Sequence, residues 1–264
     1  MNIFVRELKA NFKSLVIWGV IVVLFVVVGV SKFSAYAGNP EMLAILDAMP
    51  PALLSAFNLT AFNLTTVSGF FGVMFTYYAL LLSIAAAMWG SDIISKEERD
   101  KTVEFALTLP VTRSRLVTAK ALAALVNCVA LLLITWGASL VSAAPYHPDS
   151  DFYRFLSLCM LALFIMQLVF LAVSLLLGCA MKQYRRASSA AVSLSLGTYF
   201  LSILAGMRSS LKFLNYFTPF KYFDAGMLLR ESRLDLTFVG LSLAIIVVSM
   251  AAAYRMYARR DLYI

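Results

Sequence analysis

The stretch FLSLCMLALFIMQLVFLAVSLLLGCAM, residues 155–181, contains 27 residues and no charged side chain. An α-helix rises about 1.5 Å per residue, so about 20 apolar residues cross the roughly 30 Å hydrocarbon core of a bilayer. The stretch is therefore long enough for one complete crossing. It predicts that this chain spans a membrane.

Uncharged runs of similar length occur on both sides of this stretch, at 14–31, 48–91, 121–148, 187–207 and 236–254. The 44-residue run 48–91 could hold two crossings, but its first part is rich in Pro, Asn and Thr, which make a poor lipid-facing helix. We therefore expect one crossing there. The sequence predicts an all-α membrane protein, a single domain over 1–264 with six transmembrane helices at approximately 14–33, 67–90, 119–143, 155–181, 187–207 and 236–256.

The composition of the whole chain supports this class. Hydrophobic residues make up 62% and charged residues only 14%, and the mean hydropathy is +0.86. Soluble domains are about one quarter charged, so an ordinary soluble enzyme, a disordered protein and a nucleic-acid-binding domain are excluded. The net charge of +8 is explained by basic loops that orient a membrane protein. The lipid bilayer is therefore an expected partner of the chain, and no nucleic-acid partner is expected.

The basic residues also predict the orientation. With six spans, 15 of the 22 Lys and Arg residues fall on the side of the two termini and seven on the other side. Because cytoplasmic loops carry the excess of Lys and Arg, both termini are expected in the cytoplasm of a multi-pass cell-membrane protein. The N-terminal part of the chain resembles a signal peptide, with an apolar stretch at Leu15–Val30 followed by the small-residue pattern Ala35-Tyr36-Ala37. The apolar stretch is slightly longer than usual and Lys32 separates it from the small residues, so we expect an uncleaved first span.

Several kinds of site are missing from the sequence. No ionisable residue lies near the middle of a predicted span, which disfavours an ion-coupled transporter. Asn127 and Gln167 are expected to make interhelical hydrogen bonds. No phosphate-binding glycine loop and no metal-ligand spacing is present. The pair Glu97-Glu98 resembles that of intramembrane metal proteases, but the histidines that those enzymes need are absent, so an intramembrane hydrolase is a remote alternative.

Two segments between spans have a character of their own. Residues 39–59 place apolar side chains at near-helical spacing, which predicts an amphipathic outer segment that lies in the interface or caps the spans. Between the second and third spans, Ser95-x-x-Glu98 fits a helix-capping box. The residues that follow predict a short apolar helix that ends at Pro110, and Thr112 can begin the next span. Such a helix either docks onto another protein or packs on the inner ends of its own spans.

The sequence EERDKTVEFALTLPVTRSRL, residues 97–116, followed by Lys120, resembles the cytoplasmic loop of type-2 membrane permeases of ATP-binding-cassette (ABC) transporters. The family pattern begins with an acidic residue, then has Gly or Lys before a Thr, and then a second acidic residue. Apolar residues and a Pro follow. The pattern ends with a Ser or Thr, an Arg, and a Lys that enters the third span. Weaker likenesses to this family are Arg6-Glu7-Leu8-Lys9, Leu53–Phe57, Thr218–Phe223 and Arg259–Leu262. Six spans per permease agree with the count above.

The resemblance implies a permease half that pairs with a second permease, identical or related, and with two cytoplasmic ATP-binding subunits. This chain itself would carry no catalytic site, no metal and no cofactor, since ATP and Mg²⁺ bind the partner subunit. The short loop helix would couple ATP binding to transport, usually export. The residues expected to make this coupling contact are Glu98, Thr102, Val103, Glu104, Phe105, Leu107, Leu109, Pro110 and Arg113.

By the same resemblance, the second and fifth spans line the transport pathway. The candidate lining residues are Phe71, Phe75, Tyr78, Ser193 and Tyr199. An aromatic path without charge favours a hydrophobic or amphipathic cargo. The fifth span also carries two stripes of small residues, Ala187/Ala191/Ser195 and Ser189/Ser193/Gly197, which allow close helix packing within the chain or against a second permease. An ATP-independent channel or carrier is the competing transport function.

Overall fold

The computed structural model describes residues 3–37, 48, 50, 54, 62–99, 111–181, 183–207 and 209–259. Six long helices dominate these residues: α1 (Ile3–Tyr36), α4 (Val67–Arg99), α6 (Arg113–Ala143), α7 (Ser150–Ala180), α8 (Tyr184–Met207) and α10 (Leu236–Arg259). Each is long and apolar enough to cross a membrane. The predictions of an all-α membrane protein and of six spans are therefore confirmed.

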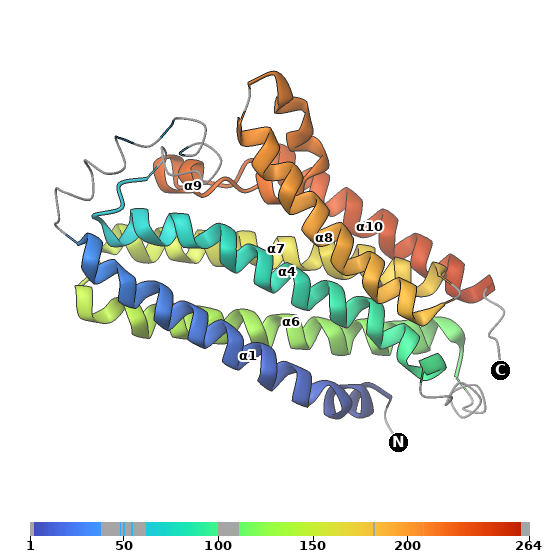
Figure 1. Ribbon diagram of the computed structural model, residues 1–264. Helices are drawn as coiled ribbons and strands as arrows, with labels where there is room; N and C mark the ends of the chain where they lie inside the picture. The colour runs from blue at the N-terminus through green and yellow to red at the C-terminus, as the bar shows by residue number, and fades with distance from the viewer. Residues whose placement is uncertain are drawn as a thin grey trace.

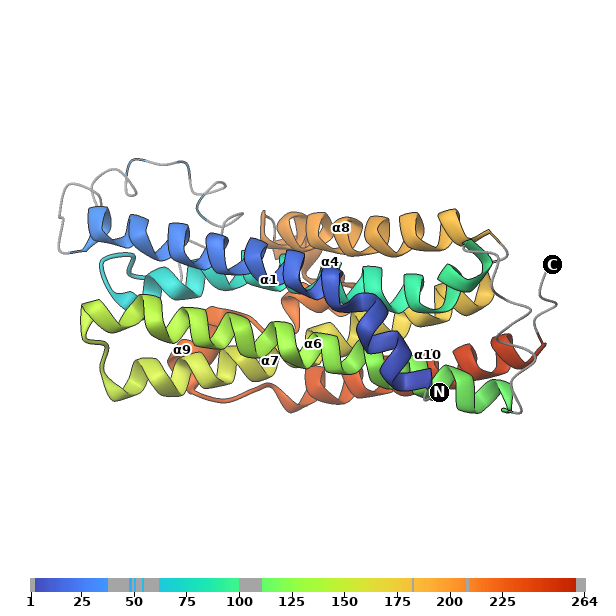
Figure 2. The same cartoon turned by 90° about the horizontal axis from the view of Figure 1, so that it is seen from below.

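The bundle is built around α4 and α7, which pack along each other through its middle (Figure 1). On one side α1 packs mainly against α6, and on the other side α8 packs on α4 and α10 on α7 (Figure 2). Of the six helices, α4 and α7 are the most buried and α1, α8 and α10 the least. A membrane protein has this pattern when its outer helices face lipid or another subunit.

Both chain termini lie at one end of the bundle, which we call the termini end (Figure 1). The other end, the far end, holds the hairpin between α6 and α7. Helices α8 and α10 have 24 residues each, whereas α1, α4, α6 and α7 have 31 to 34. The chain between α8 and α10 forms three short helices, η3 (Ser209–Phe217), η4 (Pro219–Lys221) and α9 (Ala225–Glu231), of which α9 lies nearest the far end (Figure 1).

Local sequence signals account for several helix boundaries. Thr112 caps α6 as the sequence predicted, because its side chain accepts a hydrogen bond from the backbone N–H of Arg115. Asp149 caps α7 by accepting from the N–H of Phe152 at 2.9 Å. The connection between these two helices is the short η2 (Ala144–Tyr146), after which His147 adopts the left-handed conformation with φ 45°. This turn makes α6 and α7 an antiparallel hairpin.

The predicted helix start at Ser95 is wrong. Helix α4 continues through this position to Arg99, and the Ser95 hydroxyl donates to the carbonyl oxygen of Ser91 at 2.7 Å within the same helix. The reason is tertiary packing: a Cβ atom on Gly178 of α7 would lie 2.9 Å from the Ser91 carbonyl oxygen. Close contact with α7 thus buries this end of α4 and keeps it helical.

Within the described part of the chain, the hydrogen bonds predicted for the Asn127 amide nitrogen and the Gln167 side chain are not found. Among the described residues, neither the Asn127 amide nitrogen nor either polar atom of Gln167 has a hydrogen-bond partner, although both side chains are buried. Serine and threonine side chains in the spans instead bond mostly to carbonyl oxygens one turn earlier, as Thr135 does to Leu131 at 2.8 Å. Polar groups in the spans are thus satisfied mainly within their own helices.

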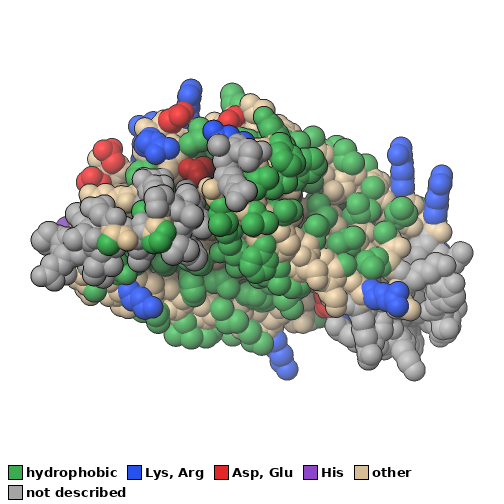
Figure 3. Space-filling model, turned by 45° about the horizontal axis from the view of Figure 1, so that its top comes forward, with side chains coloured by type: hydrophobic (Ala, Val, Ile, Leu, Met, Phe, Trp, Pro, Cys, Tyr) green, Lys and Arg blue, Asp and Glu red, His purple; other side chains and the backbone are tan. Residues whose placement is uncertain are grey.

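The surface of the bundle has the character of a lipid-facing one. Hydrophobic side chains fill the middle of the face shown in Figure 3, and most charged side chains lie to either side of this region. Large apolar residues are exposed along α1 in particular, among them Ile17, Val20 and Leu24. An exposed apolar surface of this extent is not found on soluble proteins. The predicted outer segment 39–59 lies almost entirely outside the described residues.

Candidate functional site

A buried group of charged residues joins three helices at the termini end. Glu7 of α1 is fully buried and forms ion pairs with Lys96 of α4 and Lys120 of α6, the latter at 3.5 Å. Lys120 is also fully buried, and its ammonium group donates to the Ile93 carbonyl oxygen of α4 at 2.6 Å. Arg6 lies 3.4 Å from the Glu7 carboxylate. We call Glu7, Lys96 and Lys120 the charge cluster.

The charge cluster lies where the chain between α4 and α6 begins, at residues 100–112, which include most of the predicted coupling residues. A buried charge is tolerated only when it is paired and hydrogen-bonded. Each of the three charges therefore holds its helix in position relative to the other two. Lys96 is three residues before the end of α4, and Lys120 is in the third turn of α6. The cluster thus holds together the two helices between which residues 100–112 run.

The other end of this segment is anchored to α10. The guanidinium of Arg113, the first residue of α6, donates to the Ala258 carbonyl oxygen at 3.2 Å and to that of Tyr257 at 3.4 Å. The Thr118 and Tyr254 hydroxyl groups lie 2.7 Å apart. The predicted coupling residues Thr102, Val103, Glu104, Phe105, Leu107, Leu109 and Pro110 lie outside the described residues, and for Glu98 only the helical backbone is described. Arg113 is the one coupling residue whose side chain is described.

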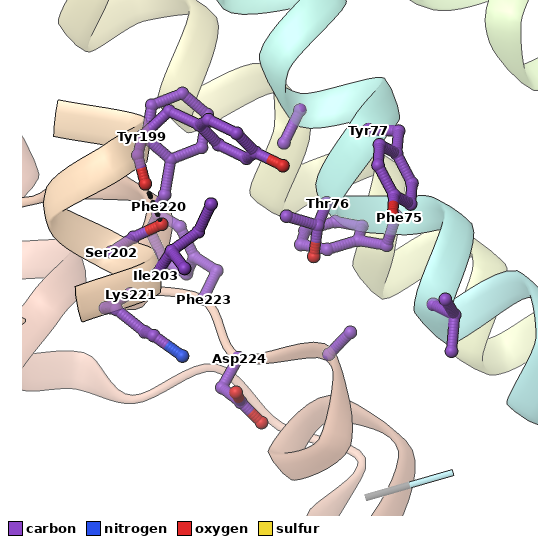
Figure 4. Close-up of a pocket in the computed structure, with 13 residues that line it drawn as sticks. Phe75, Thr76, Tyr77, Tyr199, Ser202, Ile203, Phe220, Lys221, Phe223 and Asp224 are labelled. Carbon is purple, nitrogen blue, oxygen red and sulfur yellow. Dashed lines mark hydrogen bonds between the residues drawn. The ribbon is translucent and has the colours of Figure 1, made fainter. Parts of the chain in front are cut away.

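A second candidate region is an aromatic cleft between α4 and α8 in the far half of the bundle (Figure 4). Phe75, Thr76 and Tyr77 of α4 face Tyr199, Ser202 and Ile203 of α8 across it. The floor is provided by η4, where Phe220 packs edge-on against Tyr199 with ring centroids 5.5 Å apart. The predicted lining residues Phe75 and Tyr199 are thus brought together although 124 positions separate them.

The cleft is narrow but has a charged rim. Its cavity of about 30 Å³ holds roughly one water molecule, whereas ligand sites usually measure about 300–1,000 Å³. Lys221 and Asp224 also line it (Figure 4). Next to them, the Tyr222 hydroxyl donates to the Tyr216 carbonyl oxygen at 2.7 Å, and burial raises the pKa of this hydroxyl above its ordinary value. The cleft can therefore receive a ligand only after α4 and α8 separate.

The other predicted pathway residues lie elsewhere. Phe71 and Tyr78 are buried on a different side of α4, where they line a small apolar void with Phe33 of α1 and Phe152 of α7. Ser193 lies on the exposed face of α8. The charge cluster is what the sequence reasoning missed. The available signal was a glutamate and two lysines placed at the inner ends of the first three spans.

The two small-residue stripes of α8 have different surroundings. Ala187, Ala191 and Ser195 are buried inside the chain, at 2% exposure or less. Ser189, Ser193 and Gly197 are exposed, and a Cβ atom on Gly197 would meet no other atom within 4 Å. Large apolar residues continue the exposed stripe at Phe200 and Leu204. The stripe Ala187/Ala191/Ser195 thus packs within the chain, and the stripe Ser189/Ser193/Gly197 faces lipid or another subunit.

Six helices that are long and apolar enough to cross a membrane define a multi-pass membrane protein. The comparison with known families assigns it further: the model of the ABC-2 family transporter proteins matches residues 1–262. The chain therefore belongs to this family and is a permease subunit of an ABC transporter, a transport subunit and not a catalytic enzyme. A search of curated proteins finds no match.

Proposed function

We propose that this permease is the membrane half of an exporter of hydrophobic or amphipathic compounds, powered by separate ATP-binding subunits at its termini end. The observation that carries the proposal is the anchoring of residues 100–112. This segment leaves α4 and enters α6 at points fixed by the charge cluster and by the Arg113 contacts with α10. Movement imposed on the segment would therefore be transmitted directly to three helices.

The orientation follows from the charge distribution. The termini end carries 15 of the 22 Lys and Arg residues under the six-span arrangement, and the side rich in these residues faces the cytoplasm. ATP is a cytoplasmic substrate, so an ATP-binding subunit has to meet the termini end. The described residues that flank the predicted coupling residues, at the end of α4 and the start of α6, lie at this end.

The cleft between α4 and α8 supports the choice of cargo. Five of its 13 lining residues are aromatic, and it carries one basic and one acidic residue. Aromatic walls with a few polar groups suit molecules that have an apolar body and a polar end. The exposed stripe Ser189/Ser193/Gly197 supports close approach of a second permease, which would enclose the pathway between two copies of α8.

The decisive experiment uses the permease together with its ATP-binding subunit. Phe105→Ala should weaken their association or coupling about tenfold to hundredfold, because a buried Phe contributes about 1.5–3 kcal/mol. Phe213→Ala is the matched control, since Phe213 is 58% exposed and lies in η3, which follows α8 away from the termini end. Insertion should stay normal for both variants. Unchanged binding, ATPase activity and transport in the Phe105 variant would refute the coupling role.

An ATP-independent channel or carrier is distinguished by the energy source. Inverted vesicles that contain the complex should accumulate an apolar dye only with ATP and Mg²⁺. The purified permease alone should hydrolyse no ATP. Dye movement at the same rate without ATP would favour the channel or carrier.

A further inference from the structure

A groove separates α1 from α4 near the termini end, outside the aromatic cleft and the core. It encloses about 580 Å³. The groove exists because α1 packs mainly on α6 and contacts α4 only sparsely. Two side-chain contacts bridge the two helices at this end: the Glu7–Lys96 ion pair and a hydrogen bond from the Trp89 indole N–H to the Ser14 hydroxyl at 2.9 Å.

The half of the groove nearer the termini end is polar. It is lined by Asn11, Lys13, Ser14, Asp92 and Lys96. The Lys13 side chain is exposed and is in no ion pair with the described part of the chain. Asn11 is only 8% exposed, yet its amide nitrogen has no hydrogen-bond partner among the described residues. A buried donor without a partner is costly, so this end is suited to an acceptor-rich ligand.

The other half of the groove is apolar and open to lipid. Ile17, Trp18 and Ile21 of α1 face Met88 of α4, and Ile17, Ile21 and Met88 are 59%, 40% and 40% exposed. Lys13 is the last charged residue before an uncharged run of 18 residues, so the polar half lies at the membrane boundary and the apolar half inside the bilayer. Eight residues of helix from Lys13 to Ile21 span about 12 Å.

We propose that this groove binds a phospholipid with an anionic headgroup from the leaflet on the termini side. The phosphate would lie between Lys13 and the Asn11 amide, and one acyl chain would follow Ile17 and Ile21 toward Met88. Basic pockets between transmembrane helices on the cytoplasmic side select such headgroups. Lys96 is paired with Glu7, so Lys13 is the lysine of the lining that can pair with a headgroup, and its positive charge favours an anionic over a zwitterionic lipid. The inference rests on the proposed function only for calling this leaflet cytoplasmic.

Such a lipid would fill the gap at the place where α1 and α4 are least connected. The lipid would also contact Lys96, which lies three residues before the end of α4. The predicted coupling segment follows this end. Occupancy by lipid would therefore stabilise the charge cluster and the inner end of α4. An anionic lipid then acts as a positive regulator of the transporter rather than as its cargo.

The test measures quenching of tryptophan fluorescence, because Trp18 lines the groove. The full chain with Trp136→Phe removes the tryptophan that does not line the groove and keeps Trp18 and Trp89, whose indole bonds the groove residue Ser14. In detergent, this variant is titrated with phosphatidylglycerol or phosphatidylcholine that carries brominated acyl chains. Brominated phosphatidylglycerol should quench at lower concentration, and unbrominated phosphatidylglycerol should compete. Native mass spectrometry of the unsubstituted chain should show phosphatidylglycerol retained after delipidation.

Lys13→Gln should weaken phosphatidylglycerol binding about fivefold, the value expected for one basic contact at a membrane surface. Lys9→Gln is the matched control, because Lys9 is exposed on α1 but does not line the groove. Equal quenching by both lipids, or equal loss in both variants, would overturn the proposal. Competition by glycerol phosphate alone would instead indicate a site for soluble anions. None of these readouts uses ATP or transport, so failure here leaves the exporter proposal untouched.

Discussion

Replacing Glu7 with Gln should destabilise the protein strongly, because it removes the negative charge that pairs two buried lysines. Lys120 is fully buried and the Lys96 side chain is 12% exposed, so Lys120 cannot turn to water and Lys96 has little access to it. Breaking a buried ion pair by removing one partner costs about 3–5 kcal/mol. At about 2–4 °C per kcal/mol for chains of 150–250 residues, the melting temperature should fall by roughly 6–20 °C.

The control for this substitution is Glu231→Gln, which removes the same charge from an exposed pair. Arg233 and Glu231 lie 2.9 Å apart, with side chains 77% and 41% exposed, so the loss should be about 0–1 kcal/mol. The double variant Glu7→Gln/Lys120→Met should recover part of the stability, because it removes one orphaned charge. Thermal unfolding of the purified permease, followed by fluorescence, measures all four proteins. A Glu7→Gln shift no larger than that of Glu231→Gln would refute the reasoning.

Three further predictions follow from packing and topology. Gly90→Ala should lower the melting temperature by several degrees, since its Cβ would lie 2.7 Å from a backbone oxygen of α7. Gly197→Ala should leave the melting temperature unchanged. Equal decreases in the melting temperature of the two variants would contradict the close packing of Gly90 against α7. Gln167→Met should leave stability unchanged or raise it, because no protein group among the described residues bonds the amide; a loss above about 1 kcal/mol would show a hidden partner. The topology is tested in a chain whose native cysteines are replaced by alanine. An impermeant thiol reagent should label a cysteine at Gln183 only from the cytoplasm and a cysteine at Ser150 only from outside. The reverse labelling pattern would show that the topology is inverted.

The sequence by itself determined the features that depend on local composition. Six uncharged runs were enough for six spans, because crossing a bilayer requires length and apolarity and little else. Thr112 was identifiable as the start of the third span, since an N-cap needs only a side-chain oxygen three residues before a free backbone N–H. The residues 97–116 were sufficient to indicate the permease family.

Only the tertiary structure decided which side chains meet. Ser95 has the local signature of a helix start, yet contact with α7 keeps it inside α4. Phe71, Phe75 and Tyr78 look alike in the sequence, but only Phe75 reaches the cleft, while the other two are buried against α1 and α7. Glu7 and Lys120 form their ion pair across 113 positions. The physical reason is the same in each case: hydropathy and capping act within a few residues, whereas burial and charge pairing depend on how separate helices pack.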